Sequence, residues 1–149
     1  MNHSRIFSGL VWLFLLMGMT SIGLFVYSLV EAPPLTYQNR PFPVLTEKVR
    51  PGAAVQLSVE RCSSADFVTT YGTTHALRNE KTKMVILMPD MKLSIDPGCH
   101  REISKINVIP PSTPPGMYSV FGIATVDGFF KSHHVAWNTE VFEVVGTQP

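Results

Sequence analysis

The stretch that decides the fold is "DPGCHREISKINVIPPSTPPGMYSV", residues 96–120. It opens on an Asp-Pro-Gly turn signal, passes through the alternating segment 101–109, and reaches a second turn, rich in proline, at 110–116. Proline fixes the backbone angle φ and glycine accepts positive values of it, so such clusters interrupt regular structure. A short alternating segment between two turns is typical of a β-strand with one buried face. The stretch therefore predicts strands joined by short turns.

The same pattern extends over most of the chain. Its clearest example is the segment 53–62, in which Val55, Leu57 and Val59 alternate with polar residues. Seven or eight short strands are expected, and turn signals separate them at the spacing of a β-sandwich. The expected strands are 43–49, 53–62, 66–72, 83–89, 91–96, 101–109, 116–126 and 131–145.

Two of these segments carry extra information. Residues 83–89, "KMVILMP", form a continuous apolar run, which predicts a strand buried on both faces. In the last segment the apolar set changes parity between Trp137 and Phe142. A one-residue shift of this kind indicates a β-bulge, and Asn138-Thr139 is its expected place.

The N-terminal part is of a different kind. Residues 6–30 contain no charged residue and no His, Asn, Gln or Pro, and all 12 prolines follow them. As a helix this segment would be about 37 Å long, enough to cross a hydrocarbon core of about 30 Å. A buried helix of a soluble protein would show a polar face. A cleaved secretory signal would have a shorter apolar run, and Pro33 is unfavourable after the only plausible cleavage site, "VEA". We therefore expect a retained transmembrane anchor.

The residues that flank this helix predict its orientation. His3, Arg5 and the free amine precede it, whereas Glu31 follows it. By the positive-inside rule the N-terminus is cytoplasmic and the remainder extracytoplasmic, as in a bacterial or phage-encoded envelope protein. The expected organisation is a cytoplasmic N-terminus (1–5), a transmembrane helix (6–30), an extended Pro-rich spacer (31–41), a β-domain (42–146) and a tail (147–149).

The charge of the chain excludes one class of function. It carries 12 Lys and Arg against 11 Asp and Glu. Without Arg5, the part after the helix is formally neutral, and no basic cluster interrupts it. Nucleic-acid binding has no electrostatic basis here, and no polybasic lipid-binding segment is present. The bilayer is expected as a partner through residues 6–30.

Over residues 42–146 the strand pattern resembles an immunoglobulin-like or fibronectin-III-like β-sandwich. The segment "PPGMY" (114–118) carries the resemblance, since it is similar to the turn that leads into the sixth strand of such domains. There a tyrosine near the strand start often caps the preceding corner, and Tyr118 would fill that place. The antibody pattern of cysteines and tryptophan is missing, because Trp137 belongs to the last strand. The resemblance implies an all-β antiparallel sandwich and says nothing of function.

The same resemblance implies a role for the two cysteines. In such a sandwich the second strand (53–62) and the fifth (101–109) are antiparallel neighbours in one sheet. Cys62 ends the former, and Cys99 just precedes the latter. A Cys62–Cys99 disulfide is therefore expected, and an extracytoplasmic location supplies the oxidising compartment. A redox or metal thiol site is the alternative, but the pair is not a C-x-x-C motif.

Metal handling by exported His and Met side chains is the second functional hypothesis. His133 and His134 are adjacent in a strand, so they point to opposite faces and need a third group, such as His100, to converge on them. Thioether sulfur favours copper(I), and one short segment holds three methionines. These are Met84, Met88 and Met91. Their ordinary role is core filler, and no cofactor is expected.

The sequence shows no catalytic constellation, since no nucleophile elbow or glycine-rich loop accompanies its Ser, His and Asp residues. The expected strand 116–126 offers a different clue, because both of its faces are apolar. A two-layer sandwich buries one face, which leaves Phe121 and Ile123 outward. Either the spacer or a long loop covers them, or they contact a protein partner or a second copy of the chain. The sequence thus favours a membrane-anchored binding or scaffolding domain, and no enzyme.

Overall fold

The computed structural model describes residues 3–146, so the first two residues and the expected tail (147–149) lie outside it. One helix, α1 (His3–Val30), precedes nine strands. The strands are β1 (Leu35–Tyr37), β2 (Lys48–Val49), β3 (Ala54–Ser63), β4 (Thr69–Asn79), β5 (Val85–Ile95), β6 (Gly98–Val108), β7 (Gly116–Asp127), β8 (Ser132–Asn138) and β9 (Phe142–Val144). The expected class, an all-β sandwich preceded by one apolar helix, is confirmed.

Contacts divide the chain into two compact units. The first consists of α1, the two residues after it, and the short segment Phe129–Lys131. Within α1 the span Ser8–Val30 has a mean hydropathy of 2.1, and none of it is buried by protein. The hydroxyl groups of Thr20, Ser21 and Ser28 donate to carbonyl oxygens of the preceding turn, so these polar groups are satisfied within the helix. By length and composition the span is a membrane anchor or a signal sequence.

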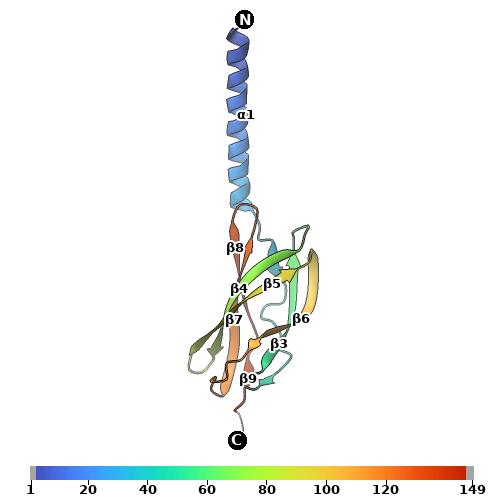
Figure 1. Cartoon of the computed structure of the whole chain (residues 1–149), viewed down its shortest axis with the longest axis vertical. Coiled ribbons are helices and arrows are strands. Elements are labelled where there is room, and N and C mark those ends of the chain that lie inside the picture. The colour runs from blue at the N-terminus through green and yellow to red at the C-terminus, as the bar shows by residue number, and fades with distance from the viewer. Residues whose placement is uncertain (1–2, 147–149) are drawn as a thin grey trace. The chain divides into compact units, whose positions relative to one another are not determined.

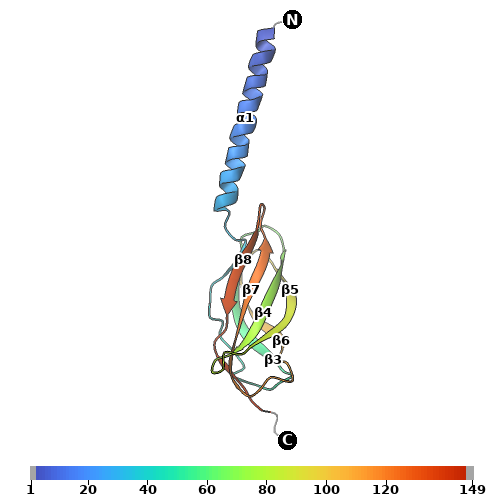
Figure 2. The same ribbon diagram turned by 90° about the vertical axis from the view of Figure 1, so that its left-hand side faces the viewer.

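The second unit, the β-domain, has two layers (Figure 1). The smaller sheet has the strand order β1-β3-β6, and the larger one has the order β2-β9-β7-β4-β5, with β8 also paired to β7. In Figure 2 the strands β8, β7, β4 and β5 lie side by side in one layer, with β3 and β6 behind them. All ladders are antiparallel except that of β2 with β9.

The core fills the space between the two layers. Alternate residues of β3 and β7 point inward, as the period of two requires. Tyr118 is fully buried, and its hydroxyl donates to the carbonyl oxygen of Pro114 at 2.9 Å. This is the corner that the sequence predicted for Tyr118. Thr113, in the same turn, is also buried.

The expected spacer 31–41 is not a free linker. Its residues Leu35–Tyr37 form β1, an edge strand that pairs with β3. Leu35 and Tyr37 belong to the core, and so does Phe42. The β-domain therefore begins near Pro33 rather than at residue 42. The prediction failed because a run of prolines forbids helix but allows an edge strand, in which only some backbone N–H groups need partners.

The expected strands 83–89 and 91–96 are one strand, β5, at the edge of the larger sheet. The prediction that the first of them is buried on both faces was wrong, since Leu87 is 83% exposed. Pro89 does not end the strand, because an edge position tolerates a residue without an N–H group. The pairing of β5 with β4 is irregular at this point, between Thr73 and His75.

The expected last strand, 131–145, is divided into β8 and β9. Both pair with β7, but Phe121 faces Asn138 whereas Tyr118 faces Phe142. Between these two pairs, the segment from Asn138 to Phe142 is therefore one residue longer than the opposing segment of β7 from Tyr118 to Phe121. The expected one-residue shift at Asn138-Thr139 is present, and it separates the two strands instead of bulging one.

Candidate functional site

The outer face of the larger sheet carries a cluster of exposed apolar side chains. We call it the outer patch and define it by Val85 and Leu87 on β5 and Phe121 and Ile123 on β7. Their exposed fractions are 48%, 83%, 38% and 46%. Neither the segment before β1 nor β1 itself covers them, because β1 pairs in the other sheet. The sequence predicted Phe121 and Ile123 as outward residues, and the structure places them so.

The strand β4 lies between the two halves of the outer patch and brings them together. Ala76 on β4 faces Leu87 on one side and Phe121 on the other. Directly opposed residues of neighbouring strands have Cβ atoms about 5 Å apart, so Leu87 and Phe121 flank a small residue. The result is a shallow groove of about 320 Å³ lined by Thr74, Ala76, Leu87, Asp90, Phe121 and Ile123.

Charged residues border the outer patch. The Arg78 guanidinium lies 5.9 Å from the centre of the Phe121 ring, a cation–π contact that orients the ring. Arg78 also pairs with the Glu80 carboxylate at 3.0 Å. The Ser119 hydroxyl and Arg78 together lower the pKa of Glu80 to about 2. An apolar centre with a charged rim is the usual composition of a protein-binding surface.

The inner side of the same strands holds the outer patch rigid. Trp137 packs flat against Gly122 of β7, where an added Cβ atom would lie 2.5 Å from the indole ring. The indole N–H donates to the Thr73 hydroxyl at 3.2 Å, and the ring stacks on Phe42 with centroids 5.6 Å apart. The β7 backbone beneath Phe121 and Ile123 is therefore fixed by a buried aromatic cluster.

His75 lies in this cluster and is only 4% exposed. Its ring is 6.0 Å from that of Trp137. Burial lowers the pKa of the imidazole below its usual value, and the Thr73 backbone together with the Asp90 carboxylate reverses only part of that shift. The folded domain therefore favours the neutral histidine.

This shift predicts a loss of stability in acid. The unfolded chain protonates His75 near its ordinary pKa of about 6.5, while the folded chain does so at a lower pH. Between these values the unfolded state binds more protons, so the free energy of unfolding falls as the pH decreases, by at most about 1.4 kcal/mol per pH unit. We expect His75→Gln to flatten this dependence in urea unfolding measured from about pH 8 to pH 5. His134→Gln, at an exposed position, is the matched control; equal slopes for wild type and His75→Gln would contradict the prediction.

The histidines proposed for a metal site do not converge. His100 lies in β6 of the smaller sheet, and its Nε2 atom is 2.8 Å from the Pro97 carbonyl oxygen. His133 and His134 lie in β8 of the larger sheet, where the Nδ1 atom of His134 contacts the Thr125 hydroxyl at 3.1 Å. Among residues 3–146, no three His, Cys, Asp or Glu side chains are placed to hold a metal ion.

The three methionines are distributed along one edge of the sheet. Met84 precedes β5 and is 40% exposed, whereas Met88 within it is buried. Met91 lines a small cavity between the sheets together with Arg61 and Glu102. Their sulfur atoms thus have three different environments, which fits packing better than a shared ligand set.

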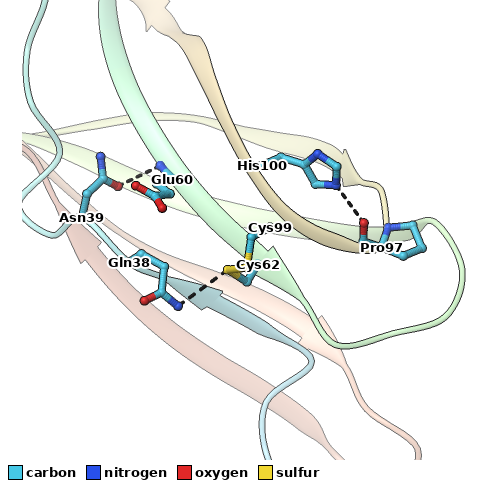
Figure 3. The surroundings of a disulfide bond; sticks show 7 residues. All are labelled: Gln38, Asn39, Glu60, Cys62, Pro97, Cys99 and His100. Atoms are coloured by element: carbon cyan, nitrogen blue, oxygen red, sulfur yellow. Dashed lines mark hydrogen bonds between the residues drawn. A yellow bond between two sulfur atoms is a disulfide. The ribbon is translucent and has the colours of Figure 1, made fainter.

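The two cysteines face each other on β3 and β6 (Figure 3). Cys62 and Cys99 form a disulfide with Cα atoms 4.0 Å apart, and the Gln38 amide contacts the Cys62 sulfur at 3.6 Å. In Figure 3 the His100 ring turns back to Pro97, away from the sulfur atoms. β6 begins at Gly98 and not at residue 101 as expected, so both cysteines lie within paired strands.

A buried arginine joins the two sheets near this end of β3. Arg61 is 7% exposed, and its guanidinium pairs with the Glu102 carboxylate on β6. Across the core it donates to the Tyr71 hydroxyl and to the Ser94 carbonyl oxygen. Arg61 has the same parity as Val55, Leu57 and Val59, so alternation alone places it on the inward row of β3, where a charged residue was not expected.

Leu87 and Val85 were not expected on the outer face, because the apolar run 83–89 was interpreted as a buried strand. A continuous apolar run is compatible with a buried strand and with an edge strand, and only the sheet order distinguishes them. The one signal that could have found them is Pro89, since proline within a strand favours an edge.

Comparisons with known proteins assign no family. No family model matches the chain, and no curated protein matches it. Solved structures that partly match include an alkylpurine DNA glycosylase of Pseudomonas fluorescens bound to DNA, at 14% identity and a TM-score of 0.44 over 76% of this chain and 31% of that one. The Bacillus subtilis sporulation control protein also matches, at 12% identity and a TM-score of 0.41 over 80% of this chain and 51% of that one. A CARDB domain from Pyrococcus furiosus in complex with di-metal ions matches at 13% identity and a TM-score of 0.39 over 78% of this chain and 95% of that one. Likenesses at this level support no conclusion about function.

Proposed function

We propose that this protein is a membrane-anchored, extracytoplasmic β-sandwich that binds another protein, or a second copy of itself, through the outer patch. The observation that carries the proposal is the exposure of four large apolar side chains on one sheet face. Scattered apolar residues are normal on a surface, but a contiguous group with a charged rim favours a binding role. The role is one of contact or scaffolding without catalysis, as in an accessory subunit of a membrane complex.

Two features support the location. The helix span Ser8–Val30 is long and apolar enough to cross a membrane. The Cys62–Cys99 disulfide fits an oxidising compartment, which is where the positive-inside rule would place the β-domain. Both features are expected of an anchor that is retained after export.

The substitution Phe121→Asp tests the binding role. Full burial of such a ring in an interface stabilises association by about 1.5–3 kcal/mol, and a buried carboxylate would add a further penalty. We expect the variant to lose co-purification with its partner, or self-association, while the melting temperature stays unchanged. Association is measured in detergent by pull-down and by sedimentation.

Ile103→Asp is the matched control, because Ile103 is 67% exposed on β6 of the opposite sheet. This control is expected to change neither association nor melting temperature. Full association by the Phe121→Asp variant would contradict the proposal. Loss of association by both variants would do the same, since it would show no preference for the outer patch.

A further inference from the structure

The turn between β7 and β8 presents two aromatic rings and a lysine. Phe129 is 82% exposed and Phe130 is 40% exposed, and their rings meet edge to face with centroids 4.7 Å apart. The Ser132 hydroxyl donates to the Asp127 carboxylate at 2.6 Å and closes the base of the turn. We call Phe129–Lys131 the aromatic tip. It is too apolar for an ordinary turn, which is normally polar and solvated.

The aromatic tip belongs to the same compact unit as α1. The Glu31 carboxylate, just after the helix, accepts hydrogen bonds from the backbone N–H groups of Phe129 and Phe130, at 2.5 and 3.3 Å. Lys131 donates through Nζ to the Ser28 carbonyl oxygen at 3.0 Å. The Phe130 ring contacts Tyr27 at 5.7 Å between centroids. Four contacts thus hold the tip at the last turn of the helix.

The length of the helix gives the depth of that turn. The span Ser8–Val30 is about 34 Å long at 1.5 Å per residue, and a bilayer core is about 30 Å thick. Its C-terminal turn, with Tyr27, therefore lies at the boundary between acyl chains and headgroups. Residues bonded to Ser28 and Glu31 lie at the same boundary.

The chemistry of the aromatic tip fits this boundary. Transfer of an exposed phenylalanine side chain from water to an apolar phase is favourable, by about 1.5–3 kcal/mol when the side chain becomes fully buried. Phenylalanine is among the residues that interfacial segments bury at the boundary between headgroups and acyl chains, and lysine can extend its ammonium group toward lipid phosphates. The Glu31 carboxylate is solvated there by the protein, since it accepts hydrogen bonds from the two backbone N–H groups of the tip.

We propose that the aromatic tip inserts into the outer lipid interface next to α1, so that the protein is attached to the bilayer at a second point in the chain. The occupant is lipid and not a protein partner, because the contacts with the helix fix the tip at headgroup depth. This inference rests on the proposed retention of the anchor.

Photo-crosslinking of the full-length protein tests it. Benzoylphenylalanine is introduced at position 129, and the protein is reconstituted in nanodiscs of phosphatidylethanolamine and phosphatidylglycerol. Leu16, within the span, is the positive control. Val141 is the negative control, because it is apolar and 49% exposed but lies beside the opposite end of β7, where β9 pairs with Gly116–Tyr118. After illumination, mass spectrometry identifies the adducts.

We expect lipid adducts at positions 16 and 129 and none at 141. Adducts at 16 without any at 129 would overturn the tip insertion and leave the anchor standing. Protein adducts at 129 in place of lipid adducts would overturn it as well. If position 16 gives no lipid adduct, or the mature chain lacks the helix by intact mass, the anchor and the tip insertion fall together.

Discussion

Replacing Cys99 by serine is expected to lower the free energy of unfolding by about 3–4 kcal/mol, the chain-entropy value for a loop of this length. The disulfide joins β3 and β6 and closes a loop between cysteines with a sequence separation of 37. Net stabilities of small domains are about 5–15 kcal/mol, so the bond supplies a large share. We expect the melting temperature to fall by roughly 10–20 °C.

Reduction provides the control for this variant. The melting temperature of the wild type in excess reductant should approach that of the Cys99→Ser variant, whose own value should be insensitive to reductant. Non-reducing mass spectrometry should find the peptides of Cys62 and Cys99 linked in protein from its native membrane. Two free thiols there, or equal melting temperatures without reductant, would contradict the prediction.

Gly122→Ala is expected to have the second largest effect on stability. The added methyl group would lie 2.5 Å from the Trp137 ring and 2.7 Å from the Thr74 carbonyl oxygen. Neither neighbour can retreat easily, because the ring is packed in the core and the oxygen belongs to β4, which is paired with a strand on each side. Overpacking of a core costs about 1–3 kcal/mol, and we expect the upper end of that range. Thermal and urea unfolding measure the change.

Gly72→Ala is the matched control on the neighbouring strand. No atom lies within 4 Å of the Cβ that this change would add. It should be neutral or stabilise the domain by about 0.4–1 kcal/mol, by restricting the unfolded chain. Similar losses from both glycine variants would show that the contact with Trp137 is not the cause. Gly122 follows Phe121 in β7 and faces the core, so displacement of the β7 backbone there would also displace Phe121. The Gly122→Ala variant should therefore also weaken association.

The fold class could be predicted because it depends on local signals. Turn chemistry and a period of two predicted β3 and β7 to within one residue and β6 apart from its first three residues, and Tyr118 marked its corner. Those signals fail where the sheet order decides whether a segment is buried, lies at an edge or forms a strand at all. β5 looked buried because its residues are apolar, and β1 looked like a linker because its flanks are prolines. The pairing partner is not encoded within the segment itself, and proline is the one local signal of an edge position.

The candidate site was predicted in part for the same reason. The two apolar rows of β7 indicated Phe121 and Ile123 as outward residues, because alternation assigns faces within one strand. Leu87 joins them only through the register of β4, which brings Ala76 between Leu87 and Phe121. The aromatic tip was also missed. Its importance depends on the distance from α1, which lies almost a hundred residues earlier in the chain.

The irregular pairing at Pro89 has a consequence for solubility. β5 is the last strand of its sheet, and its exposed Val85 and Leu87 would make a regular edge prone to pair with other chains. Proline offers no N–H group to an incoming strand, and the shift in register beside it breaks the row of backbone groups. Growth of β-aggregates along this edge is thereby hindered, while the side chains on the sheet face remain accessible. The same strand can thus carry an exposed apolar face and an edge that resists fibril formation.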